Sequence, residues 1–130
     1  MLKPLPFFAV AATLWLAAVS AALADIKDYE FQLVQNEIKS GEAIVAVRVV
    51  HKPSGKPVPD AVIFSKRLDM APENMATMTT PLEPVETSEP GVYRFKTKLT
   101  MEGRWQLSVA AKLQGESGTL QGRLILKAVP

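Results

Sequence analysis

The chain has 130 residues, no cysteine, one histidine and a formal net charge of +2 at pH 7. Disulfides and thiolate ligands are therefore excluded, and the nearly balanced charge gives no indication of nucleic-acid binding. No Ser-His or Cys-His constellation is visible around the single His51, so we expect no catalytic residues and a protein that is not an enzyme.

The N-terminal segment is typical of an export signal. Lys3 supplies a positive charge, residues 6–23 are almost wholly apolar, and Ala22-Leu23-Ala24 is a small-x-small cleavage site. We expect residues 1–24 to be a signal peptide and residues 25–130 to form a single domain in the periplasm. An uncleaved leader would instead anchor the domain facing the periplasm, because the apolar stretch approaches the roughly 20 residues that span a bilayer. Membrane contact is expected only in that case.

The residues after 24 alternate between apolar and polar side chains in short runs, which is the period of half-buried strands. The first half of the domain contains three such runs, around residues 29–33, 45–49 and 61–67. The second half contains three more, around residues 92–99, 105–113 and 120–126, which we expect to form an antiparallel meander. A seventh strand over residues 82–86 would lie at a sheet edge, because Pro81 and Pro84 cannot donate to a strand ladder.

Turn motifs such as Ser40-Gly41 and Glu89-Pro90-Gly91 separate these runs. Six or seven short strands with such turns predict an all-β fold, an Ig-like antiparallel β-sandwich. Its core is expected from the inward positions of the strands. These are Phe31, Val47, Phe64, Tyr93, Phe95, Trp105, Leu107, Val109 and Leu124.

Three methionines, Met70, Met75 and Met78, lie within nine residues in the stretch DMAPENMATMTTP. The interleaved proline, glutamate, asparagine and threonines favour a loop over a buried strand. Neutral thioethers on a flexible loop suit soft Cu(I), which tolerates two or three ligands, whereas harder cations prefer imidazole or carboxylate. The alternative is that these side chains are apolar plugs at the open end of the sandwich.

Other side chains offer little to a metal. Met101 could supply a fourth ligand, but packing under a loop is the expected role, and His51 is expected to be a solvated residue at a strand end. Asp60, Asp69 and Glu73 are too sparse for a calcium site. We expect no cofactor-binding residues besides the three methionines as metal ligands.

The runs SGKPVPDAVI, MAPENMATMTTPLEPV and EPGVYRFKTKLTMEGRWQLSV follow one another in this order. Together they resemble the FixH/YtkA-like family of exported Ig-like β-sandwich domains over about residues 44–127. The resemblance implies an association with copper handling and heavy-metal efflux, and it carries a methionine-rich segment onto Met70, Met75 and Met78. Some relatives carry an auxin-binding label.

The expected function is therefore a periplasmic Cu(I)-binding or carrier domain for metal efflux or copper delivery. A rival hypothesis is an Ig-like interaction module whose methionines contact a membrane efflux or oxidase-assembly complex. A third is the binding of a small aromatic acid between the sheets, close enough to quench the fluorescence of Trp105.

Overall fold

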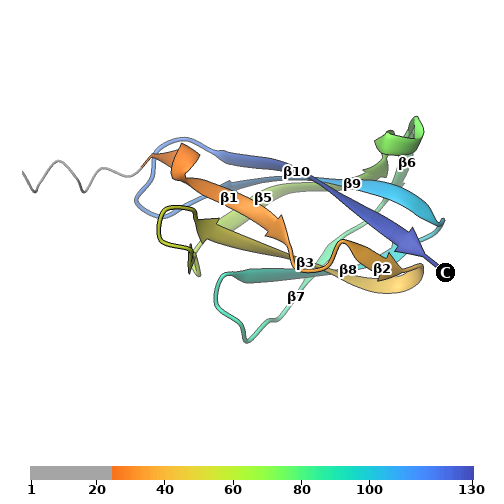
Figure 1. Ribbon diagram of the computed structural model, residues 1–130, viewed down its shortest axis with the longest axis horizontal. Helices are drawn as coiled ribbons and strands as arrows, with labels where there is room; N and C mark the ends of the chain where they lie inside the picture. The colour runs from red at the N-terminus through yellow and green to blue at the C-terminus, as the bar shows by residue number, and fades with distance from the viewer. Residues whose placement is uncertain (1–24) are drawn as a thin grey trace, which may run out of the picture.

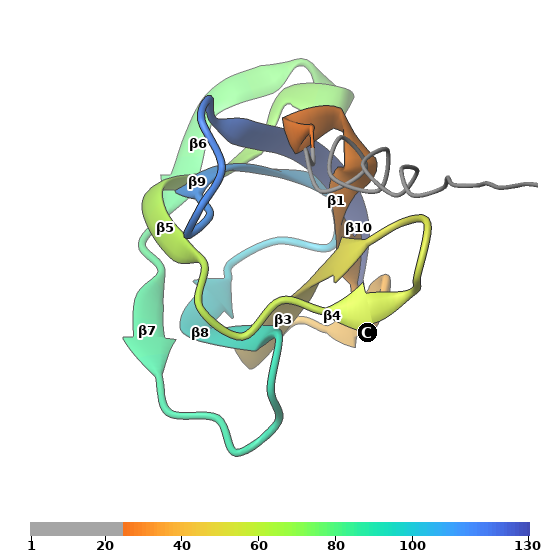
Figure 2. The same cartoon turned by 90° about the vertical axis from the view of Figure 1, so that its left-hand side faces the viewer.

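The structure, a computed structural model, describes residues 25–130, which form two β-sheets packed face to face (Figures 1 and 2). The predicted signal peptide, residues 1–24, lies outside the described residues. The strands are β1 (Tyr29–Leu33), β2 (Glu37–Lys39), β3 (Gly41–His51), β4 (Lys56–Pro57), β5 (Val62–Met70), β6 (Met75–Thr80), β7 (Glu83–Val85), β8 (Val92–Leu99), β9 (Gly103–Lys112) and β10 (Leu120–Val129). Two 3₁₀ turns accompany them, η2 (Ile26–Asp28) and η3 (Ala71–Glu73). The prediction of an all-β sandwich is confirmed.

Within residues 25–130, no helix has the length and apolar character needed to cross a membrane.

The first sheet has the strand order β1-β3-β8-β7, with β4 paired to the end of β3. The second sheet has the order β2-β10-β9-β5-β6. The predicted meander is wrong, because β8 lies in the first sheet while β9 and β10 pair in the second. The expectation of purely antiparallel pairing is wrong at one place, since β2 runs parallel to β10.

The core lies between the sheets, where inward side chains of alternating strand positions meet. Its largest fully buried side chains are Trp105, Leu68, Met70, Leu99, Leu107, Leu126, Val45, Val47 and Val49. Of the predicted core residues, six are buried: Phe31, Val47, Phe95, Trp105, Leu107 and Val109. Tyr93 and Leu124 are half-buried and pack against this core.

Phe64 is a wrong core prediction, because 55% of its surface is exposed. Ile63 pairs with Ala111 and Ser65 with Ala110, so Phe64 is the extra residue of a β-bulge in β5. The bulge shifts the alternation of inward and outward side chains by one residue, which a strict period of two cannot anticipate.

Both ends of the sandwich can be followed in Figure 1. The end with η3 also holds the turn between β8 and β9 and the C-terminus, and η2 lies at the opposite end. We call the first of these the η3 end.

The two phenylalanines Phe95 and Phe64 offer a matched test of this core. We expect Phe95→Ala to lower the free energy of unfolding by about 3–5 kcal/mol, the usual cost of removing a buried phenylalanine. Phe64→Ala should change it by less than about 0.5 kcal/mol, as exposed sites do. Urea denaturation followed by circular dichroism measures both values, and similar losses in the two variants would contradict this description of the core.

Candidate functional site

The methionine segment is a β-hairpin at the η3 end. Met70 ends β5, and Met75 and Met78 lie in β6, so the loop prediction is wrong for all three. The residues that favoured a loop form the corner between the strands: Pro72 lies in η3, and Asn74 closes it in the left-handed conformation with φ 64°. Asparagine tolerates this conformation better than most residues.

The hairpin pairs two of the three methionines. Met70 and Met75 are Cα partners on neighbouring antiparallel strands, and directly opposed residues project to the same face of a sheet. The previous pair is Asp69 with Thr79, so residues 76–78 fall in a register shift. Met78 therefore lies beside the pair in an irregular part of β6.

The three side chains differ in burial. Met70 is fully buried within the core, whereas Met75 and Met78 are half-buried and pack against it. A Cβ built onto Gly103 would lie 3.1 Å from the Met70 Cε atom, and Gly103 has φ +128°. Glycine at this position both accepts that backbone conformation and leaves room for Met70. The Met70 side chain thus fills space in the core at this end of the sandwich, as the alternative of an apolar plug predicts.

An ion pair ties η3 to the start of β9. Glu73 Oε2 accepts hydrogen bonds from the Arg104 backbone nitrogen at 2.9 Å and from Arg104 Nε at 3.1 Å. Arg104 Nη2 also donates to the Pro72 carbonyl oxygen at 2.9 Å. The hydrogen bonds from the Arg104 side chain and then from its backbone lower the pKa of the Glu73 carboxyl below its ordinary value.

A second ion pair braces the other side of the hairpin. The buried Asp69 carboxylate accepts from Arg67 Nε at 2.7 Å and from the Ala71 backbone nitrogen at 2.9 Å. Arg67 Nη2 donates to the Ala76 carbonyl oxygen at 2.7 Å. The carboxylates of Asp69 and Glu73 are therefore each engaged with an arginine. No group of three or more His, Asp or Glu side chains that could hold a metal ion occurs within residues 25–130.

The turn between β8 and β9 contributes Met101 to the same end. The Met101 carbonyl oxygen accepts a hydrogen bond of 3.0 Å from Trp105 Nε1, and its side chain is 38% exposed. Trp105 itself is fully buried. A small aromatic acid could approach Trp105 only by displacing core side chains.

His51 lies away from the methionines. It ends β3, where it pairs with Tyr29, at the end of the sandwich opposite η3 (Figure 1). Its Nδ1 atom is 2.8 Å from Ser54 Oγ, and its ring centroid is 5.1 Å from that of Tyr29. The histidine is therefore engaged locally and cannot join Met70 and Met75.

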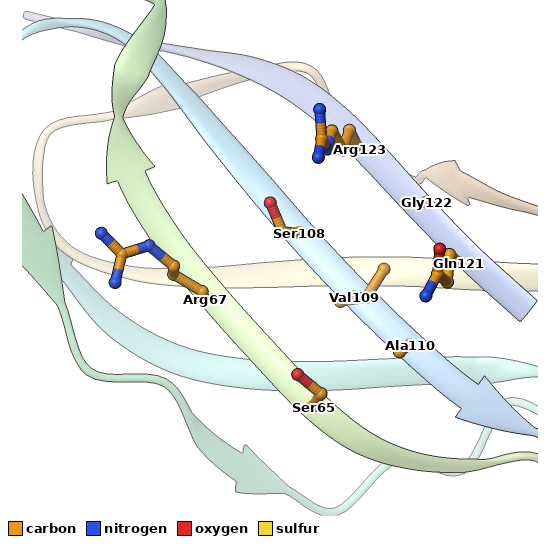
Figure 3. A pocket seen from close by; sticks show the side chains of 8 residues that line it. All are labelled: Ser65, Arg67, Ser108, Val109, Ala110, Gln121, Gly122 and Arg123. Carbon is orange, nitrogen blue, oxygen red and sulfur yellow. The ribbon is translucent and has the colours of Figure 1, made fainter. Parts of the chain in front are cut away.

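The outer face of the second sheet has a shallow hollow of about 400 Å³ (Figure 3). Arg67, Ser108 and Arg123 form a row across three strands of this face. Figure 3 shows the Arg67 guanidinium turned away from Ser108, and the ion pair with Asp69 holds it there. The two arginines do not converge, so this hollow assembles no ligand site.

Comparison with known proteins identifies a family. The model of the family described as YtkA-like matches residues 23–110, which is more than half of the chain, and confirms the resemblance predicted from the sequence. No curated protein matches the sequence.

Similar solved structures are remote. The ZirS C-terminal domain is 12% identical with a TM-score of 0.47, and the match covers 98% of this chain and 84% of that one. A conjugative transposon lipoprotein from Bacteroides eggerthii DSM 20697 is 11% identical with a TM-score of 0.35, and the match covers 76% of this chain and 96% of that one.

The contact between Glu73 and Arg104 predicts that the stability of the hairpin depends on pH. Because the folded-state pKa of Glu73 is lowered, its contribution to stability is present above the unfolded-state pKa and is lost as the pH falls through the folded-state pKa. In Arg104→Met the pKa of Glu73 should rise towards its ordinary value, whereas Arg94→Met on the other sheet should leave it unchanged. An NMR titration of the side-chain carboxyl measures this shift. A Glu73 pKa that is the same in Arg104→Met and wild type would contradict the contact.

Burial also ranks the three methionines by their effect on stability. We expect Met70→Ala to cost about 2–5 kcal/mol of unfolding free energy, as buried methionines do. Met75→Ala and Met78→Ala should cost clearly less, because both side chains are only half-buried. Denaturant titration of the three variants tests the ranking, and it fails if Met78→Ala is as costly as Met70→Ala.

Proposed function

This chain belongs to the YtkA-like family, and we propose that it is a non-enzymatic periplasmic domain that binds Cu(I) through Met70, Met75 and Met78. It would carry the ion for heavy-metal efflux or copper delivery. The observation that supports the proposal is the cross-strand pairing of Met70 with Met75 at one end of the sandwich, with Met78 in the adjoining register shift.

The chemistry of the donors suits this ion. Thioethers are soft and neutral, and Cu(I) accepts two or three of them. They do not protonate in the physiological range, so binding would be nearly independent of pH. The neighbouring arginines, Arg67 and Arg104, are each paired with a carboxylate, which reduces their repulsion of a bound cation.

The three sulfurs would contribute differently. Met75 and Met78 are half-buried and reach the surface, where they could take the ion from solvent or from a donor protein. Met70 is buried and would complete the site from the core side. In this proposal the irregular part of the hairpin, residues 76–78, would adjust so that all three sulfurs reach the ion, while the two ion pairs hold its corner.

The second candidate is a docking module for a membrane efflux or oxidase-assembly complex. The observation that favours it is the apolar surface at the η3 end, where half-buried Met75 and Met78 accompany the exposed Met101. Flexible methionine side chains suit adaptable protein contacts.

Competition for Cu(I) with a chromophoric chelator tests the first candidate. The triple variant Met70→Leu, Met75→Leu, Met78→Leu keeps apolar side chains of similar volume and should stay folded. We expect its affinity for Cu(I) to fall by more than about tenfold. A loss of that size follows even from mutating residues that only support the metal ligands. Met101→Leu is the matched control and should bind as wild type does. Equal affinity of the triple variant and wild type would end the Cu(I) proposal.

Capture from solubilised membranes separates the two candidates. A docking module should retain its partner when a Cu(I) chelator is present and lose it when Met75 and Met78 are changed to glutamine. A copper carrier should capture its partner only with Cu(I) loaded. Copper-independent capture that survives both glutamine changes would contradict the docking role of these methionines.

A further inference from the structure

β5 of the second sheet and β7 of the first lie on the same side of the sandwich (Figure 2). β6 pairs only with Leu68, Asp69 and Met70 of β5. Residues 62–66 of β5 therefore have β9 on one edge and, within residues 25–130, no strand on the other. We call this part of β5 the free edge.

A cavity of about 190 Å³ opens beside the free edge, between the two sheets. It is lined by Ile63, Lys66, Pro84, Val85, Thr87, Tyr93, Arg94 and Phe95. Its volume is close to the roughly 150 Å³ of a cavity that holds benzene. One aromatic or branched side chain would fill it.

The wall of the cavity is fixed before anything binds. The Tyr93 hydroxyl donates to the Val58 carbonyl oxygen at 2.7 Å and accepts from the Ala61 backbone nitrogen at 3.0 Å. These bonds hold the ring of Tyr93 and the chain that leads into β5. On β5 itself, Val62 is 63% exposed and Phe64 is 55% exposed, so this strand also presents apolar surface outside the cavity.

Lys66 brings a positive charge into this apolar setting. Its ammonium nitrogen lies 6.0 Å from the centroid of the Phe95 ring, and the side chain makes no ion pair with any residue of the described domain. A half-buried ammonium beside an aromatic ring favours an anionic group next to it.

A strand edge with unpaired backbone groups can accept an extended peptide, which gains affinity from main-chain hydrogen bonds and specificity from pockets for alternate side chains. A strand added at the free edge would extend the second sheet over the opening. Every other side chain of that strand would then face the first sheet, and one of these would enter the cavity.

We propose that residues 62–66 bind an extended segment of a partner protein as an added β-strand, with one apolar side chain in the cavity and a carboxylate next to Lys66. This site is separate from the methionines and does not depend on copper.

The occupant is a different protein rather than a second copy of this chain. Two copies joined through this edge would bring two bulges at Phe64 together and place two Lys66 ammonium groups near each other without a carboxylate. Bulges and inward charges are features that keep strand edges from pairing indiscriminately. Here the charge also selects among partners, because a carboxylate in the added strand would neutralise it.

The probe is a synthetic eight-residue peptide that alternates threonine with valine, phenylalanine, glutamate and valine. It is titrated into ¹⁵N-labelled protein purified from the producing cells and observed by NMR. We expect shifts of the amide signals of residues 62–66, 85–87 and 93–95. A peptide with glutamine in place of glutamate should bind about fivefold more weakly, the loss expected of a partly exposed ion pair.

Two further arms make the test decisive. An N-methylated peptide keeps the side chains but cannot form the ladder, and it should not bind. Lys66→Glu should prefer a lysine peptide over the glutamate peptide, whereas Lys127→Glu, on the outer face of β10, should keep the wild-type preference.

The proposal is overturned if the wild-type protein does not bind the glutamate peptide, or if the shifts lie elsewhere. Equal binding of the N-methylated peptide would overturn it in favour of a small-ligand cavity. Sedimentation of the free protein as a dimer that Lys66→Glu disrupts would overturn it in favour of self-association.

Discussion

The burial of Trp105 is the constraint on which the η3 end depends. A buried indole must place its N–H on an acceptor, and here that acceptor is the carbonyl of Met101, which fixes the turn between β8 and β9. The turn presents Gly103 over Met70 and directs Arg104 to Glu73. In a domain without disulfides, the buried Trp105 thus fixes the turn whose residues contact Met70 and Glu73 of the methionine hairpin.

In this arrangement, the proposed binding of copper and the packing of the core both use the Met70 side chain. Met70 belongs to the core, while Met75 and Met78 lie partly in solvent. A site that needs all three thioethers must draw the Met70 side chain out of its core packing. The free energy lost in moving that side chain lowers the net affinity for the ion. A carrier that must release its metal ion benefits from this lowered affinity. A protein that only stores metal would not.

The sequence predicted best what depends on regular alternation. The strand over residues 92–99 has the predicted bounds, and six predicted core residues are buried, because a strict period of two needs no other information. The prediction failed at Phe64, where a bulge shifts the alternation of inward and outward side chains by one residue. It also failed at the methionines, where proline and asparagine form a short corner between two strands rather than a long loop.

β2, β4 and most of β6 are short or irregular and owe their form to tertiary partners. The change of sheet between β8 and β9 leaves no local signal, and neither does the cavity at the free edge, which residues from three separate strands create together.

The position of β10 governs when this fold can form. The last strand of the chain lies inside the second sheet, between β2 and β9. β1, β3 and β8 can pair as soon as they are made. The second sheet stays split until residues 120–129 are available, because β2 pairs with no strand of residues 25–130 other than β10. Non-local pairing of this kind is slow. In a nascent chain the first sheet can therefore form before the second, which remains in two parts until residues 120–129 join them.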